Sequence, residues 1–206
     1  MPLHGLPDLA LIRPGRMHEA TGPGRLAFAA ALAGRLTGPV LWVQESRTRD
    51  TLCPQGLVAF FDPARLVLAR PTGARAVLQV AEEALRSGAA PLVVAELAEA
   101  ADLTASRRLQ LAAGTGGGRG LCLLPQARTR PNAAETRWHC APIPGSIPGR
   151  GRQLWELVKN KRGRLGTWEI VWGEIVWGEA AWQERAGETP EKSPGGGATR
   201  PVAACA

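Results

Sequence analysis

The sequence lacks any apolar run long enough to cross a lipid bilayer. Every such run is well short of the roughly 20 residues that a membrane-spanning helix needs. The first residues also lack the order of basic and then apolar residues that marks a secretory signal. We therefore expect a cytoplasmic protein without a membrane partner.

Motifs for metal binding and nucleophilic catalysis are also missing. The four cysteines have no C-x-x-C spacing, and none of the three histidines sits in a recognisable motif; these residues are Cys53, Cys122, Cys140, Cys205, His4, His18 and His139. Scattered cysteines of this kind do not indicate a zinc site, and a cytoplasmic location argues against a disulfide framework. We expect no metal, no cofactor and no catalytic residue.

Basic residues are plentiful, and nearly all of them are arginine. The formal net charge is +7, and 45% of the residues are apolar, which is enough for a substantial core. A basic surface favours polyanionic partners. The alternative is that the arginine and alanine content reflects a GC-rich genome rather than a partner.

Short runs rich in Val and Leu alternate with helical patterns in the first part of the chain. We predict buried strands at residues 39–44, 65–69, 91–96 and 120–125. A helix is predicted up to a C-cap at Gly88, and a second from an N-cap at Thr104 to Gly114. This alternation predicts an α/β domain with a mainly parallel sheet over residues 1–126.

The pattern changes after residue 126. Trp-bearing segments separated by Pro and Gly predict antiparallel strands that extend the same domain over residues 127–182. Residues 183–206 are polar and rich in Gly and Pro, so we predict a disordered tail there.

The stretch "HEATGPGRLAFAAALAG" (residues 18–34) has the outline of a phosphate-binding loop that leads into a helix. A working loop has the form G-x-x-x-x-G-K-[ST], in which Lys neutralises phosphates and the hydroxyl binds magnesium. Here Gly22 and Gly24 enclose one residue, Arg25 replaces Lys, and the next two residues carry no hydroxyl. We favour an ordinary strand-to-helix turn; the alternative is a residual anion site beside Arg25.

The order of these motifs resembles the ImuA family of bacterial SOS cassettes. The stretches that carry the resemblance are "GRMHEATGPGRLAFAAALAG", "GPVLWVQESRTRDTLCPQGLVAFFDPARLVLAR", "AVLQVAEEALRSGAAPLVVAELAEAADLTASRRLQLAAG", "AETRWHCAPIP" and "RQLWELVKNKRGRLGTWEIVW". Together they cover about residues 10–172, and "LTASRRLQLAA" is the most specific of them. The resemblance implies a RecA-type P-loop core.

The same resemblance implies positions for a degenerate nucleotide site. Glu96 corresponds to the magnesium-linked acid of RecA, and Glu45 lies near the position of its water-activating Glu. Gln126 and Arg128 match the strand that leads to a DNA-facing loop, but the long glycine-bearing loop itself is not recognisable. Without the Lys and hydroxyl of the phosphate loop, we expect structural or interface roles for the two acids.

The resemblance also implies partners. Members of the family act in damage-induced mutagenesis beside an inactive Y-family polymerase relative (ImuB) and an error-prone C-family polymerase, with RecA as a further contact. We therefore expect a non-catalytic accessory protein of translesion synthesis. A residual DNA-dependent ATPase and a plain single-stranded DNA-binding protein remain as alternatives.

Basic residues are concentrated in residues 128–164, where we predict, together with Gln126, a surface for DNA or a protein partner. Its candidate residues are Gln126, Arg128, Arg130, Arg137, Arg150, Arg152, Lys159, Lys161 and Arg162. Arginines interleaved with Trp138 and Trp155 are typical of single-stranded DNA binding. The preferred interpretation of the two tryptophans is burial in the core, with an acidic protein surface as the alternative partner of the arginines.

The acidic end of the chain has a different character. Trp172, Trp177 and Trp182 lie among glutamates, and aromatic anchors often carry much of the energy of a protein interface. We predict that these three tryptophans dock into a groove of a partner protein.

Overall fold

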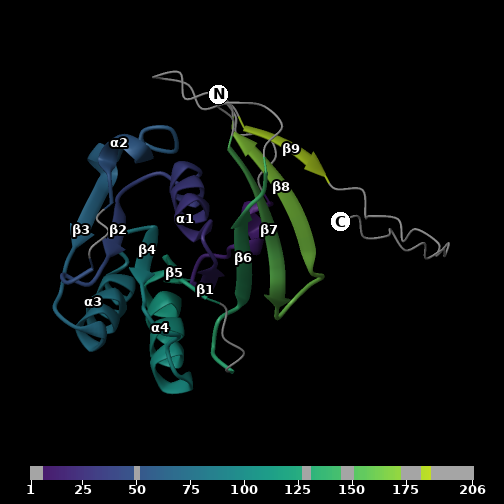
Figure 1. Cartoon of the computed structure of the whole chain (residues 1–206). Coiled ribbons are helices and arrows are strands. Elements are labelled where there is room, and N and C mark those ends of the chain that lie inside the picture. Colours follow the sequence, from purple (N-terminus) through teal and green to yellow (C-terminus); the bar gives the residue numbers. More distant parts are fainter. Residues whose placement is uncertain (1–6, 49–51, 127–130, 145–150, 173–181, 187–206) are drawn as a thin grey trace, which may run out of the picture.

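A computed structural model describes residues 7–48, 52–126, 131–144, 151–172 and 182–186 (Figure 1). One nine-stranded sheet has the order β3-β2-β4-β5-β1-β6-β7-β8-β9. Its strands are β1 (Arg16–Thr21), β2 (Val40–Val43), β3 (Leu66–Ala69), β4 (Leu92–Glu96), β5 (Arg119–Leu124), β6 (Thr136–Pro142), β7 (Gly151–Asn160), β8 (Gly166–Trp172) and β9 (Trp182–Ala186). The sheet therefore runs without a break through both predicted parts of the domain.

Strands β1 to β6 pair in parallel, and β7, β8 and β9 follow as antiparallel strands. The helices are α1 (Arg25–Gly34), α2 (Pro54–Leu57), α3 (Ala74–Ser87) and α4 (Leu103–Gly116), with short 3-10 turns at Leu9–Leu11 and Pro63–Arg65. The predicted α/β class and mainly parallel sheet are thus confirmed, as are all four predicted strands. No described helix has the length and apolar character needed to span a membrane.

Helices cover both faces of the parallel strands, and this produces two cores. On one face, the Ala-rich side of α1 packs with Trp42, Leu92 and Leu121. On the other face, α3 and α4 pack side by side against the sheet through residues such as Leu85 and Leu109. Strands β2, β4 and β5 are largely apolar on both faces because each face is covered.

Helix α3 ends at Ser87 with Gly88 as its C-cap, as predicted. Helix α4 differs from the prediction at both ends. Its N-cap is Asp102, whose carboxylate accepts a hydrogen bond from the Ala105 amide at 2.7 Å, and not Thr104. It ends at Gly116, with Gly117 in the left-handed conformation, and not at Gly114. Either a carboxylate or a hydroxyl can cap a helix, so the residue type alone did not fix the position.

Strand β6 corrects the prediction of antiparallel strands beyond residue 126. It runs parallel to β1, with Thr21 opposite His139, and becomes antiparallel only toward β7. Side-chain contacts hold this pairing: the Thr21 hydroxyl donates to the Trp138 carbonyl at 3.0 Å, and His18 Nδ1 lies 2.8 Å from Thr136 Oγ1. The prediction is correct for β7, β8 and β9.

The two tryptophans of the basic segment are buried, as preferred from the sequence. Trp138 is 0% exposed and Trp155 is 2% exposed. Both rings contact Phe28 of α1, with centroid separations of 5.2 and 4.8 Å. At the far edge, β9 includes residues 183–186, for which the sequence predicts a disordered tail; the rest of that tail lies outside the described residues.

Candidate functional site

The candidate phosphate loop joins the end of β1 to the start of α1. Gly22, Pro23 and Gly24 form the turn, and Arg25 is the first residue of the helix. A loop between a strand and a helix at the carboxyl edge of a parallel sheet is where α/β proteins bind phosphates. The position is therefore that of a phosphate loop, and its contacts decide what it can do.

Strand β6 lies directly against this turn. Gly22 has φ +88°, and a Cβ atom there would come within 2.5 Å of the Cys140 carbonyl oxygen. A Cβ atom at Gly24 would meet Gln153 Oε1 at 2.5 Å. The two glycines are thus explained by close packing against β6 and β7, without any ligand.

The polar groups of the turn are bonded within the protein. The Gly24 amide donates to the Cys140 carbonyl at 2.9 Å, and the Arg25 amide lies 3.3 Å from the Gly22 carbonyl. The Arg25 guanidinium donates to the same Gly22 carbonyl at 3.1 Å. A phosphate that used these groups would have to displace bonds that the fold already makes.

The two candidate acids lie at the carboxyl edge of neighbouring strands. Glu96 ends β4, and its Oε1 accepts hydrogen bonds from Trp42 Nε1 at 2.7 Å and Gln44 Nε2 at 3.3 Å. Glu45 is half-buried just beyond β2. Because the buried Trp42 needs an acceptor for its indole N–H, the contacts of Glu96 fit a structural role.

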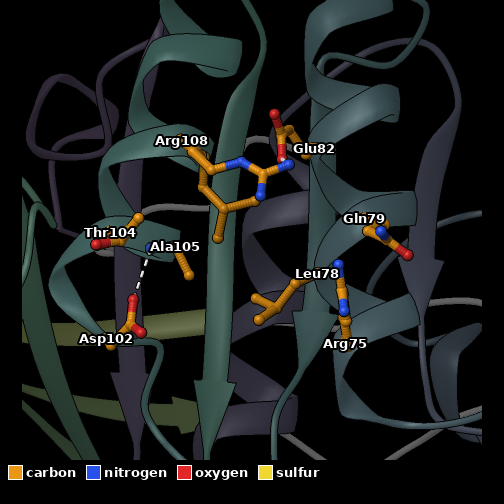
Figure 2. A pocket seen from close by; sticks show the side chains of 9 residues that line it. Arg75, Leu78, Gln79, Glu82, Asp102, Thr104, Ala105 and Arg108 are labelled. Carbon is orange, nitrogen blue, oxygen red and sulfur yellow. Dashed lines mark hydrogen bonds and ion pairs between the residues drawn. The ribbon is translucent and has the colours of Figure 1, made fainter.

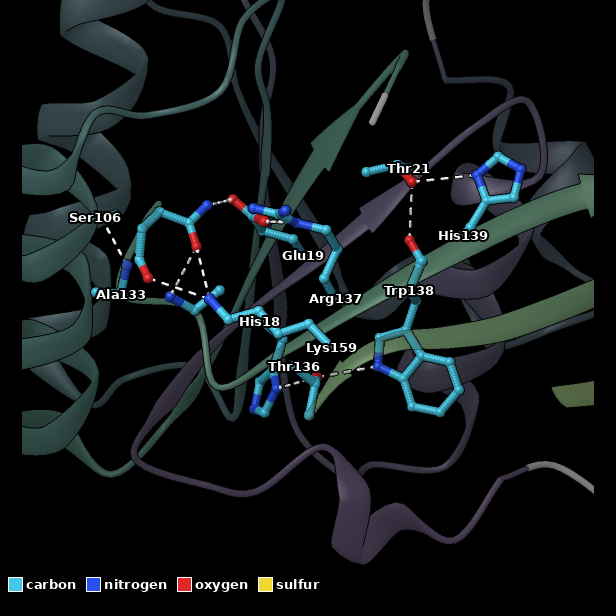
Figure 3. A network of polar contacts seen from close by, with 12 residues as sticks. His18, Glu19, Thr21, Ser106, Ala133, Thr136, Arg137, Trp138, His139 and Lys159 are labelled. Carbon is cyan, nitrogen blue, oxygen red and sulfur yellow. Dashed lines mark hydrogen bonds and ion pairs between the residues drawn. The ribbon is translucent and has the colours of Figure 1, made fainter. Parts of the chain in front are cut away.

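A buried carboxylate lies in the middle of the sheet, at Glu19 on β1 (Figure 3). Glu19 is 1% exposed; Arg137 Nε donates to its Oε2 at 2.7 Å, and the Asn132 amide donates to its Oε1. Lys159 donates to the Asn132 carbonyl at 3.2 Å, and burial lowers the pKa of this lysine. The cluster compensates the buried charge and ties β1, β6 and β7 to the segment before β6.

His18, next to Glu19 on β1, is fully buried on the opposite face of the sheet. Its Nδ1 lies 2.8 Å from Thr136 Oγ1, and its Nε2 lies 3.1 Å from the Arg13 carbonyl. Burial lowers the pKa of His18 to about 4. The ring is therefore neutral near pH 7, with both nitrogens engaged inside the fold.

Comparison with known proteins shows the family of this chain. Two curated relatives named Protein ImuA, from two strains of Caulobacter vibrioides, are each 36% identical to the chain over 182 residues. The matches cover 75% of this chain and 73% of each relative. The chain belongs to the ImuA family. No family model matches it.

In this ImuA-family chain, the described residues of the predicted basic surface make contacts within the fold. Arg137 pairs with Glu19, Arg152 Nε donates to Glu169 at 2.9 Å, and Arg162 Nε lies 3.0 Å from Glu135. The ammonium group of Lys161 donates to the Ala133 carbonyl at 2.7 Å, and Lys159 donates to Asn132. Only Gln126, just after β5, is exposed without a side-chain contact within the described residues.

The remaining candidates of this ImuA-family chain can be placed only in part. Arg128, Arg130, Arg150 and Trp177 lie outside the described residues. Trp172 ends β8 and Trp182 begins β9, and their Cα atoms are register partners across this hairpin. DNA binding by the basic residues and docking by the tryptophans both stay predictions.

The sequence reasoning missed the polar strand β1 of this ImuA-family chain and therefore its buried side chains. "RMHEAT" looks like a polar lead-in, whereas central parallel strands usually read as apolar runs. The signal that could have found it is the loop itself, because a phosphate-type loop follows a strand. Asn132 carried no signal, since its contact with Glu19 joins residues far apart in the chain.

Proposed function

We propose that this chain is a non-catalytic, RecA-like accessory protein of damage-induced mutagenic translesion synthesis. Membership in the ImuA family implies a part in damage-induced mutagenesis. The finer statement, that the chain works through contacts with other proteins and without nucleotide turnover, rests on the phosphate loop.

The observation that supports the proposal is the turn at the end of β1, whose polar groups are hydrogen-bonded within the protein. The Gly24 amide donates to Cys140, and the Arg25 guanidinium donates to Gly22. The sequence also lacks the Lys and the hydroxyl that neutralise phosphates and bind magnesium. The backbone amide of Gly24 is therefore already hydrogen-bonded, and the loop lacks the side chains needed for nucleotide chemistry.

We further propose that the core is of the RecA type. Support comes from the strand–glycine turn–helix unit at β1 and α1, the parallel sheet with helices on both faces, and Glu96 at the carboxyl end of β4. A scaffold of this kind can keep its shape after its chemistry is lost, and then serve as an interaction module.

The proposed partners are an ImuB-like relative of Y-family polymerases, an error-prone C-family polymerase and RecA. We propose that the segment with Trp172, Trp177 and Trp182 contributes to docking, because tryptophans are favoured anchors of protein interfaces. Direct contact with single-stranded DNA is the second candidate function, and it rests on Arg128 and Arg130.

The proposal is tested by co-purifying the chain with its ImuB-like partner, with and without ATP and magnesium. We expect a stable complex under both conditions, and a weaker complex after deletion of residues 173–206. Phosphate release stimulated by single-stranded DNA would contradict the proposal and favour a residual ATPase.

DNA binding is tested separately with Arg128→Ala/Arg130→Ala. Arg137 is left intact, because its removal would leave the Glu19 carboxylate buried without its ion pair. A protein that acts only through protein contacts keeps its partner complex in this variant. A salt-sensitive DNA affinity that disappears in the variant would favour the DNA-binding alternative.

A further inference from the structure

A groove runs between α3 and α4 on the face of the protein away from α1 (Figure 2). It encloses about 280 Å³. Leu78 and Ala105 point toward one another from the two helices. Leu109 is the third apolar residue that lines the groove. Grooves of this kind accept the apolar side of a partner helix.

An ion-pair cluster fixes one end of the groove. Arg108 of α4 reaches Glu82 of α3 at 2.6 Å, and Arg86 pairs with Glu82 and Glu83 at 2.5 Å each. The Glu82 side chain is 9% exposed and its partner Arg108 is 59% exposed, so this contact joins the two helices at the surface. Both helices are therefore held in place before any partner binds.

Beside the groove, α4 exposes two leucines. Leu103 is 45% exposed and Leu111 is 71% exposed. Arg107 lies midway between them, four residues from each, so the three share one helical face. With Thr104 and Arg108 they form what we call the Leu–Arg face of α4, which contains no acidic residue.

The charge of this region leaves two arginines available. Within the described residues, the side chains of Arg75 and Arg107 make no ion pair or hydrogen bond, whereas Arg86 and Arg108 are engaged by the α3 glutamates. The remaining acid of the groove, Asp102, is used as the cap of α4. The region thus offers exposed leucines together with two arginines, Arg75 and Arg107, that lie outside these ion pairs.

We propose that the groove and the Leu–Arg face bind an acidic amphipathic helix of a partner protein. Its apolar residues would cover Leu111 and the apolar residues of the groove, and its flanking carboxylates would pair with Arg107 and Arg75. Exposed leucines on either side of Arg107 favour a protein partner over a nucleic acid, whose backbone offers phosphates and no apolar surface. The surface differs from the tryptophan segment proposed above, so either could fail alone.

The test uses a fluorescent peptide that forms one amphipathic helix, with leucines on one side and glutamates on the other. We expect the protein to bind it, and Leu111→Ser and Arg107→Gln each to weaken binding about tenfold, the loss typical of a central contact. Leu165→Ser is the matched control, because Leu165 is also 62% exposed but follows β7 in the sequence. This control is expected to bind like the parent protein.

Three results would overturn the proposal. They are no binding of the acidic peptide, equal binding of a peptide with lysines in place of the glutamates, and equal losses in the Leu165→Ser control. A single-stranded oligonucleotide that binds in an Arg107-dependent and Leu111-independent manner would assign the face to nucleic acid instead. Because the side chains of Leu111 and Arg107 are exposed, we expect both variants to keep the melting temperature of the parent protein. Thermal unfolding of each variant checks that a loss of peptide binding is not caused by misfolding.

Discussion

At the scale of single residues, the turn after β1 requires glycines because β6 approaches it closely. Gly22 has a positive φ and no room for a Cβ atom, because the Cys140 carbonyl occupies that space. A sequence motif alone would attribute such a glycine to phosphate binding. The packing gives a different reason for the same residue.

We predict that Gly22→Ala destabilises the protein more than Gly73→Ala. Both glycines have similar φ values, +88° and +90°, but a Cβ atom at Gly73 would meet nothing within 4 Å. Backbone strain on the order of 1–3 kcal/mol accompanies a side chain at either positive φ, and the collision at Gly22 adds roughly 1–3 kcal/mol. Thermal unfolding measures the difference, and equal melting temperatures would mean that β6 does not press on the turn.

The buried His18 predicts a pH dependence of stability. Its pKa is lowered to about 4 in the folded protein against 6.5 in an unfolded chain, so between these values the unfolded chain binds more protons. The contribution of the neutral, buried His18 to the free energy of unfolding is therefore fully present above about pH 6.5. It is lost as the pH falls toward 4. The expected loss is roughly 3 kcal/mol.

Denaturant unfolding at several pH values checks this expectation. In His18→Gln, the free energy of unfolding should change less between pH 7 and pH 4.5 than in the parent protein, whatever the variant loses at pH 7. Identical pH slopes would show that His18 does not carry the effect.

At the scale of elements, the strands and helices with strong patterns were predictable and the polar ones were not. The 3.6-residue periodicity located α3, and apolar runs located β2 to β5. Strand β1 was not predicted, because its buried His18, Glu19 and Thr21 make hydrogen bonds to residues more than 80 positions away in the sequence. The parallel placement of β6 depends on the same contacts, which local pattern does not contain.

The cap of α4 provides a prediction at this scale. Asp102→Ala removes the hydrogen bond to the Ala105 amide and should cost about 1 kcal/mol. Thr104→Ala, the position that the sequence suggested as the cap, should leave stability nearly unchanged, since Thr104 is exposed within the helix. Chemical denaturation of the two variants compares them, and the reverse order would place the cap at Thr104.

At the scale of the whole molecule, one sheet joins a parallel half, β1 to β6, to an antiparallel half, β7 to β9. The Gly24 amide and Gln153 show how the two halves meet at the turn. The missing Lys and hydroxyl could be read from the sequence. That β6 and β7 fill the space beside the loop could not, because it depends on how distant strands pack.

The central claim, that the glycine turn after β1 does not bind nucleotide, is tested most directly by isothermal titration calorimetry of the full chain with ATP and magnesium. We predict no saturable heat of binding at millimolar nucleotide and no shift of the melting temperature. Saturable binding of ATP that Arg25→Ala abolishes would contradict the account, because it would place a nucleotide at the turn against which β6 packs.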